Sequence, residues 1–411
     1  MVKLAKRVIA GYAVALFCGT AAFAQDAAKS PAKGETRGEV GPGVPALWVR
    51  PGYKVTLAAS DIGRPVRFME VGDDGTLYVS QPGPGKILSL KDKDGDGVYE
   101  TKADFLTGYR QVHSMAFDGG WLYATSSDDG SCRRMKDTDG DGKADQVEVF
   151  LKPGSIPKGG GHPYRGIVFT EKYVYVTVSD PGNMSDDLPS DNKCVYRFDR
   201  DGGNRMQFAT GLRNTEKLRL RPGTEEIWGL DHGSDNFGAT WEGKARRRDQ
   251  PITDLLPGEE LNKIEEGKFY GHPFISNNRI VRPEFSNRGD ILDLAGKTTP
   301  PEWILPAHWA GNGFTFLTKD YFPGQQGDLY AAYHGSWNST LRVGYCVERI
   351  LFDQVTGKPY GNQSIVVGLQ NGEPGGGVLV RPVDCAEAPD GTVLFSCDMT
   401  NKIYRISKVS Q

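Results

Sequence analysis

A two-stranded unit recurs six times along the chain, and this repeat constrains the fold more than any other feature. In each copy a generally glycine-led apolar strand is followed by a polar turn and a second strand. The copies begin at Gly75, Gly119, Glu171, Thr224, Gly327 and Gly391. Their period is about 45 to 65 residues, with one roughly double gap. Such a unit cannot bury both faces alone, so the copies must stack in a ring. The sequence therefore predicts an all-β protein that forms a six-bladed β-propeller.

The double gap lies between the fourth and fifth copies, from Ala239 to about Pro306. It predicts a long excursion over one face of the propeller, where functional residues are often found. Helical patterns are nearly absent. The best of them is "GEELNKIEEGK" near Glu259.

The N-terminus has the pattern of a secretory signal peptide over residues 1–24, with a basic start, a short apolar run and a small-residue cleavage site. Residues 25–45 predict a flexible leader, which leaves a propeller domain at residues 46–411. The apolar run is too short to span a bilayer, so we expect a periplasmic or secreted protein without a membrane span. Loss of three basic residues with the signal peptide changes the net charge from −3 to −6, which argues against nucleic acid as a partner.

The cysteines permit disulfides in an oxidising compartment. Five of them follow the signal peptide, and an odd number leaves at least one thiol free. Cys385 and Cys397 are expected to pair across the last hairpin, and Cys132 and Cys194 are the competing pair. No CxxCH motif is present, so the chain carries no c-type haem of its own.

Two acidic runs match the pattern of calcium-binding loops. In "DTDGDGKADQVE" the candidate ligands are Asp137, Asp139, Asp141, Asp145 and Glu148. In the weaker match, "DKDGDGVYETKA", Ala103 occupies the position of the bidentate carboxylate. Acidic hairpin turns without calcium are the alternative. In either case we expect structural loops on the rim of the blades.

Histidine moves protons near neutral pH, and four of the six histidines lie at strand starts or in turns between the repeats. They are His162, His232, His308 and His334. In a propeller such positions gather around the central channel at one end. Arg213 and Asn214, in "TGLRN", strengthen this candidate site. His113 and His272 are predicted to be structural.

Five motifs occur in a specific order: "GLRN", "DHG", "ELN", "YGHP" and "HGSWN". In this order they resemble the soluble quinoprotein sugar dehydrogenases, most closely the sorbosone dehydrogenase-like branch. The resemblance extends from about Pro51 to Ile406. It implies a six-bladed propeller that binds pyrroloquinoline quinone (PQQ) and calcium. The implied activity is oxidation of an aldose or sorbosone-like sugar, with a cytochrome or quinone as external electron acceptor.

The resemblance also implies roles for individual residues. His162 matches the general base, and Gly233 and Ser234 match calcium ligands that act through their carbonyl oxygens. Arg213 and Asn214 match quinone contacts, and a planar guanidinium suits the PQQ carboxylates. Further candidate cofactor contacts are Arg67, His232, His308, His334 and Arg342.

The chain departs from the family pattern at three positions, so substrate choice is not carried over. His272 replaces the usual Trp, Ser339 the frequent Arg, and Thr215 the usual Pro. Two other classes remain open. One is a calcium-dependent lactone hydrolase of the gluconolactonase-like type, which binds its ion through carboxylate and asparagine side chains. The other is a non-catalytic propeller that binds a carbohydrate or a protein partner.

Overall fold

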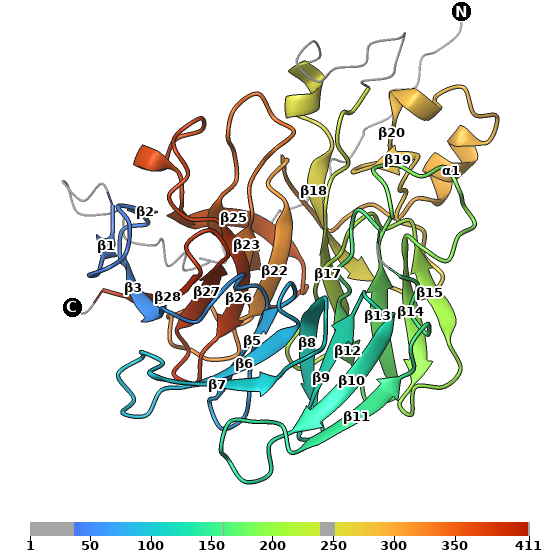
Figure 1. The fold of residues 1–411 in the computed structure, drawn as a ribbon. Coiled ribbons are helices and arrows are strands. Elements are labelled where there is room, and N and C mark those ends of the chain that lie inside the picture. The colour runs from blue at the N-terminus through green and yellow to red at the C-terminus, as the bar shows by residue number, and fades with distance from the viewer. Residues whose placement is uncertain (1–36, 159, 239–250, 410–411) are drawn as a thin grey trace, which may run out of the picture. The chain divides into compact units, whose positions relative to one another are not determined.

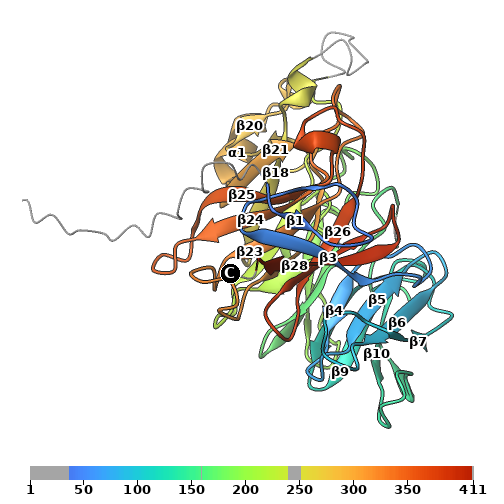
Figure 2. The same ribbon diagram turned by 90° about the vertical axis from the view of Figure 1, so that its left-hand side faces the viewer.

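The computed structural model describes residues 37–158, 160–238 and 251–409. Six main sheets surround a central axis, which confirms the predicted six-bladed β-propeller (Figure 1, Figure 2). The first strands of successive sheets contact one another around the ring. The predicted signal peptide and most of the predicted leader lie outside the described residues.

The first three blades each consist of four strands in chain order. Blade 1 contains β4 (Met69–Val71), β5 (Leu77–Gln81), β6 (Lys86–Lys91) and β7 (Thr101–Leu106). Blade 2 contains β8 (Val112–Asp118), β9 (Trp121–Ser126), β10 (Ser131–Lys136) and β11 (Gln146–Leu151). Blade 3 contains β12 (Ile167–Phe169), β13 (Tyr173–Val178), β14 (Cys194–Asp199) and β15 (Met206–Thr210).

The last three blades include insertions and N-terminal strands. Blade 4 contains β16 (Leu218–Leu220), β17 (Ile227–Asp231), β18 (Gly258–Ile264) and β21 (Trp303–Ala307). Blade 5 contains β22 (Gly311–Phe316), β23 (Leu329–Tyr333), β24 (Cys346–Phe352), β25 (Pro359–Val367) and β2 (Trp48–Val49). Blade 6 contains β26 (Pro382–Glu387), β27 (Val393–Cys397), β28 (Lys402–Lys408), β3 (Tyr53–Ala59) and β1 (Glu39–Val40).

The two ends of the described chain close the ring. β3 is the fourth strand of blade 6 and runs antiparallel to β28, with Ile406 opposite Val55. β1 adds a parallel edge to β3, with Val40 opposite Val55. Residues 39–40, which lie in the segment predicted as a leader, thus form a strand of blade 6.

Five of the predicted repeats correspond to the second and third strands of a blade. The copy at Thr224 corresponds to the second strand β17 of blade 4, whose neighbour β18 lies inside the predicted excursion. The second strands β5, β17, β23 and β27 are buried at every position because neighbouring blades cover both faces of the sheet. Continuous apolar or small-residue runs are the pattern expected for such strands. Burial of one such side chain, for example Phe395, stabilises the fold by roughly 1.5–3 kcal/mol.

The predicted excursion belongs to blade 4 and contains the hairpin β19 (Ile275–Ser276) and β20 (Ile280–Val281) and the helix α1 (Ile291–Lys297). Figure 1 shows these elements together above β14 and β15. Short 3-10 turns cover Pro251–Asp254, Pro283–Phe285 and Gln370–Gly372.

The helix signal near Glu259 was wrong, because "GEELNKI" forms the strand β18. Its residues pair with β17 on one side and β21 on the other, and Glu260 lies opposite Asp231. Burial of almost the whole segment between two blades overrides the helical propensity of Glu, Leu and Lys.

Neither predicted disulfide is formed, and the five described cysteines are free and buried. In the β26–β27 ladder Cys397 lies opposite Pro382, and Cys385 lies opposite Phe395. The two sulfur atoms are therefore offset along the hairpin. Cys132 and Cys194 lie in the same apolar cluster between blades 2 and 3, and both remain thiols.

Candidate functional site

A cavity of about 360 Å³ is formed by segments that precede β12, β16 and β22 and by segments that follow β17 and β23. In a propeller these segments belong to the same end of the ring. The residues predicted for the site that line this cavity are Arg67, His162, Arg213, Asn214, His232, Gly233, His308 and His334.

Sequence reasoning did not single out several other residues of the cavity wall. These are Tyr164, Glu216, Asp235, Glu259, Asn312, Trp337 and Asn338. A signal for most of them was present, because they lie inside or beside the quoted motifs. Asp235 lies two residues after "DHG", Trp337 and Asn338 belong to "HGSWN", and Glu259 belongs to "GEELNKIEEGK".

Two of the predicted site residues lie elsewhere. Arg342 is exposed, and its carbonyl accepts a hydrogen bond from the Gly375 amide at 2.8 Å. Ser234 is buried, and its hydroxyl accepts a hydrogen bond from Arg282. It lines a smaller cavity of about 20 Å³, which shares Arg213, His232 and Gly233 with the larger one.

His162 is held in a single tautomer. Its Nδ1 lies 2.7 Å from the carbonyl oxygen of Asp180, which can only accept, so Nδ1 carries the proton. The other ring nitrogen, Nε2, then has a free lone pair. Burial, helped by the positive charge of Arg213, lowers the pKa of His162. The ring is thus neutral near neutral pH and suited to accept a proton.

Arg213 is 4% exposed and is anchored by three neighbours. Its Nη1 donates to the carbonyl oxygen of Gly233 at 3.1 Å, and its Nη2 donates to the carboxylate of Asp235 at 3.1 Å. Asn183 accepts hydrogen bonds from Nε and Nη2. The guanidinium therefore brings a fixed positive charge to the wall of the cavity.

Asn214 and His232 form a second fixed pair. The Asn214 amide donates to His232 Nδ1 at 3.0 Å, and His232 Nε2 donates to the Gly311 carbonyl at 3.0 Å. Burial lowers the pKa of His232 to about 3. With both nitrogens engaged and the ring neutral, His232 orients Asn214.

Arg67 and His334 meet at Asp398. Arg67 donates to Asp398 at 3.2 Å and to Glu216 at 3.1 Å, and His334 Nε2 donates to Asp398 at 2.9 Å. Although burial opposes it, the hydrogen bond from His334 holds the pKa of Asp398 below its usual range. His308 is anchored separately, because its Nε2 donates to the carbonyl of Thr253.

Two buried polar atoms of the cavity wall have no hydrogen-bond partner among the described residues. They are the Nε of Arg67, a donor, and the Oδ1 of Asn214, an acceptor. A buried polar group without a partner costs about 1–3 kcal/mol, so these atoms mark places where a ligand can bind.

Buried carboxylates lie close to the 233–234 loop. Glu259 is 2% exposed and accepts a hydrogen bond from the Gly233 amide at 3.3 Å, and burial raises its pKa to about 8. In the smaller cavity, Glu260 lies near Asp231, and burial and that neighbour raise the pKa of Glu260 to about 8. A cation would relieve the cost of burying these groups.

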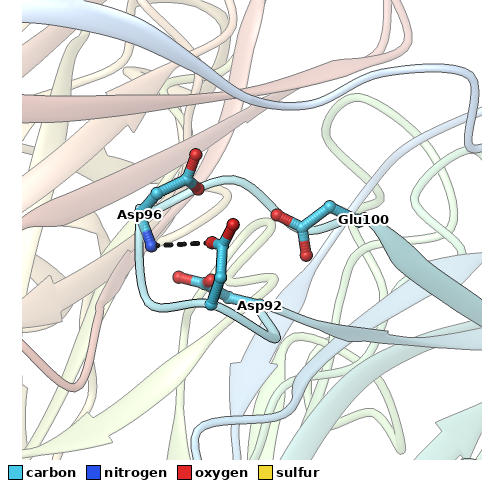
Figure 3. A group of neighbouring side chains, drawn as sticks. Asp92, Asp96 and Glu100 are labelled. Carbon is cyan, nitrogen blue, oxygen red and sulfur yellow. Dashed lines mark hydrogen bonds between the residues drawn. The ribbon is translucent and has the colours of Figure 1, made fainter.

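The two DxDxDG loops connect the third and fourth strands of blades 1 and 2. One ligand atom from each of Asp92, Asp94, Asp96 and Glu100 lies within 4.8 Å of the others, and Figure 3 shows three of these side chains around the β6–β7 loop. Glu100, which the sequence pattern did not single out, thus supplies a carboxylate to the weaker match.

The second loop, between β10 and β11, brings Asp137, Asp139 and Asp145 within the same distance of one another. Asp141 lies on the loop, where its carboxylate accepts the Lys143 amide at 2.7 Å. Glu148 instead lies on β11, where it accepts a hydrogen bond from Arg134 Nε at 2.8 Å.

Both loops dock on the blade that precedes them. Arg405 on β28 donates to the Gly97 carbonyl at 3.0 Å, and Ser89 on β6 donates to the Gly142 carbonyl at 2.6 Å. Gly97 and Gly142 occupy equivalent positions with φ of +91° and +88°, which disfavour a side chain. The loops therefore link blade 6 to blade 1 and blade 1 to blade 2.

Comparisons with known proteins extend over most of the chain. The sequence model of the TrAA12-like family matches residues 47–409. An uncharacterised protein of Borreliella burgdorferi is 31% identical over 200 residues, which are 48% of this chain and 48% of that protein. The match thus spans about half the length of that relative.

Two solved structures have a similar fold. The holo form of the pyranose dehydrogenase PQQ domain from Coprinopsis cinerea has a TM-score of 0.75 at 18% identity, over 90% of this chain and 100% of that one. The calcium structure of the Trichoderma reesei family AA12 enzyme has a TM-score of 0.74 at 17% identity, over 89% and 98%. At these identities the similarity supports the propeller fold.

A search of the helices in residues 37–158, 160–238 and 251–409 for length and apolar character finds none that could cross a bilayer.

Proposed function

Because the chain belongs to the TrAA12-like family, we propose that it is an exported quinoprotein dehydrogenase that oxidises a sugar with PQQ and calcium. The observation that carries this proposal is the cavity in which the candidate base His162, the buried Arg67 and Arg213, and two unpaired polar atoms meet. Of the two similar structures, one is the holo form of a PQQ domain and the other is a calcium structure, and both support PQQ and calcium as the proposed cofactor and ion.

The residues of the cavity fit the chemistry of PQQ. Its volume of about 360 Å³ lies within the usual range of small-molecule sites. Arg67 would hold PQQ through its unpaired Nε, which suits an acceptor oxygen, and Asn214 would hold it through its unpaired Oδ1, which suits a donor. Arg213 adds positive charge beside them. When bound, the quinone would supply the redox chemistry by accepting a hydride from the sugar.

His162 would act as the general base toward the sugar hydroxyl. Its Nδ1 proton is committed to the Asp180 carbonyl, so Nε2 is the atom that takes the hydroxyl proton. The lowered pKa keeps this nitrogen unprotonated near neutral pH. A base in this state contributes typically 10²–10⁴-fold to the rate.

Calcium would bind beside the 233–234 loop. The carbonyl oxygens of Gly233 and Ser234 are hard ligands, and the carboxylates of Glu259 and Asp235 lie in the same cavity wall as Gly233. The carbonyl of Gly233 accepts one hydrogen bond from Arg213, which leaves its second lone pair for an ion. Structural calcium ions would occupy the two DxDxDG loops, where they would strengthen the links between blades.

The sugar and the electron acceptor would use the open side of the cavity. Trp337 lines the cavity and is 67% exposed, and aromatic faces commonly pack against sugar rings. An aldose or sorbosone-like sugar fits this wall. The electrons would then pass to an external cytochrome or quinone in the periplasm or outside the cell.

The lactone hydrolase is the weaker alternative for this cavity. Arg67 and Arg213 form ion pairs within the chain, but the Nε of Arg67 remains unpaired. A carboxylate of PQQ can accept from this Nε, whereas a neutral lactone brings no negative charge to it. The same buried Arg67 and Arg213 also disfavour a propeller without catalytic function.

Titration of the purified apo-protein with PQQ and Ca²⁺, followed by a dye-linked assay with a panel of aldoses and 2-keto-aldoses, tests the proposal. We expect saturable PQQ binding and sugar-dependent dye reduction that requires both additions. Absence of PQQ binding, or lactone hydrolysis that depends on calcium but not on PQQ, would overturn the proposal.

A further inference from the structure

His272 was predicted to be structural, yet the structure connects it to the candidate base. It is 7% exposed, and its Nε2 lies 2.7 Å from the carboxylate of Asp180. Asp180 is the residue whose carbonyl holds His162. We propose that His272 is a positioning residue for His162 and acts through Asp180. The proposal rests on the role of His162 in the proposed function.

Both the carboxylate and the backbone amide of Asp180 are held by hydrogen bonds. Its carboxylate accepts hydrogen bonds from His272, from the Ser185 hydroxyl at 2.6 Å and from the Gly182 amide at 2.8 Å. Its backbone amide donates to the carbonyl of Arg213 at 2.8 Å. With the side chain and the amide held, the direction of the Asp180 carbonyl is set, and with it the orientation of the His162 ring.

The segment that carries His162 also rests on this turn. The amide of Gly161 donates to the carbonyl of Pro181 at 2.7 Å. A Cβ at Gly160 would lie only 2.7 Å from the Cα of Pro181, so the two backbones are in close contact. A shift of the turn that begins at Asp180 therefore moves both the acceptor of His162 and the backbone beside it.

His272 is the donor to Asp180 that comes from outside this turn. Ser185 and Gly182 belong to the same short segment as Asp180, whereas His272 follows β18 in blade 4. The carboxylate is fully buried, and a hydrogen bond to a charged group is stronger than one between neutral groups. The backbone of His272 is held independently, because its amide donates to the Gly211 carbonyl at 3.0 Å. A change of side chain at this position leaves that anchor in place.

The test compares His272→Phe, which keeps a ring but removes the donor, with His272→Gln, whose side-chain amide can still donate to Asp180. We expect His272→Phe to lower kcat on the order of 10²-fold, the cost of misplacing a reacting group by about 1 Å. Affinity for PQQ should stay close to that of the parent protein, whereas thermal stability should fall, because the buried Asp180 carboxylate loses one of its donors. His272→Gln should recover most of the lost kcat.

A spectroscopic measurement on the apo-protein separates this inference from the proposed function. In ¹⁵N-histidine-labelled protein, His162 should show one tautomer, protonated at Nδ1, in the parent and in His272→Gln. In His272→Phe this signature should be lost. Should His272→Phe fail to fold, Ser185→Ala removes another donor from the same carboxylate and should perturb the same His162 signals.

The outcomes are distinct. An unchanged His162 signature in a folded His272→Phe or Ser185→Ala protein overturns the positioning role, as does a His272→Phe enzyme with parental kcat. A parent protein that binds no PQQ and oxidises no sugar overturns the proposed function, while the His162 spectrum still decides the structural link.

Discussion

Replacement of His162 by alanine is the sharpest perturbation of the proposed mechanism. The side chain's hydrogen bond within the described chain runs from Nδ1 to the Asp180 carbonyl, and Nε2 faces no partner there. The His162 carbonyl accepts from Arg165 at 2.8 Å, and this backbone contact survives the substitution. Truncation thus removes the base and leaves its loop anchored. Loss of a general base costs typically 10²–10⁴-fold, equivalent to about 2.7–5.4 kcal/mol in activation free energy.

The pH dependence provides a second readout. Burial lowers the pKa of His162 below its usual value of 6.5, so the parent should gain kcat/KM as pH rises through that lowered pKa and should reach a plateau by neutral pH. The imidazolium form, present on the acidic side, cannot accept the hydroxyl proton. In His162→Ala this acid limb should disappear.

Measurement of PQQ binding distinguishes a variant that has lost the general base from a variant that no longer binds the cofactor. Isothermal titration should give His162→Ala a PQQ affinity within a few-fold of the parent, because Arg67, Arg213 and Asn214 remain. Arg213→Ala is the matched contrast and should weaken PQQ by about 1.5–3 kcal/mol, the worth of a hydrogen bond to a charged group. A His162→Ala enzyme that keeps the parental rate and acid limb would refute the assignment of the base, and His308 or His334 would then be tested.

Three further predictions concern stability. Lys217→Met should destabilise the protein by about 3–5 kcal/mol in urea unfolding because it leaves the buried Asp384 carboxylate unpaired, and adding Asp384→Leu should recover most of the loss. Burial raises the pKa of Glu348, so the parent should lose stability relative to Glu348→Gln as pH rises above the unfolded value of about 4.5, and an equal pH response in both proteins would contradict this. Ca²⁺ should raise the melting temperature of the parent, and Asp137→Ala should reduce that gain.

Much of the architecture could be predicted because it depends on local pattern. The six copies repeat with the alternation of apolar runs and turns that a propeller blade requires, and the structure confirms one blade for each copy. The strand β18 around Glu259 could not be predicted from local pattern, because it depends on pairing with β17 and β21, which are distant in sequence. The predicted Cys385–Cys397 pair failed because the register of the hairpin places Cys385 opposite Phe395, two residues away from Cys397.

In the site, too, the residues in local motifs could be predicted, whereas roles that depend on contacts between blades could not. Histidines, arginine and asparagine at the ends of strands were found from the motifs, because the topology brings these ends together. The functions of Asp180, Asp398 and Glu216 could not be inferred, since each depends on partners from other blades. Asp180, for example, acquires its importance only from the meeting of His162 and His272.

Ion pairs connect opposite blades across the central axis of the propeller. Blades 1 and 4 lie opposite each other in the ring, yet charged residues beside β4 and β16 meet across the axis. Arg67 pairs with Glu216 at 3.1 Å, and Arg219 pairs with Glu70.

Between these two pairs in sequence lies Lys217, which pairs at 2.6 Å with Asp384 of blade 6. A Cβ at Gly313 would overlap the carboxylate of Asp384, so the glycine makes room for this pair. Glu216, which takes part in one of these ion pairs, also lines the cavity, and Trp337 on the same wall is 67% exposed. Under the proposed function, the exposed side of the cavity at Trp337 would serve both the sugar and the electron acceptor. The oxidised sugar would then have to leave before a bulky acceptor approached the cofactor.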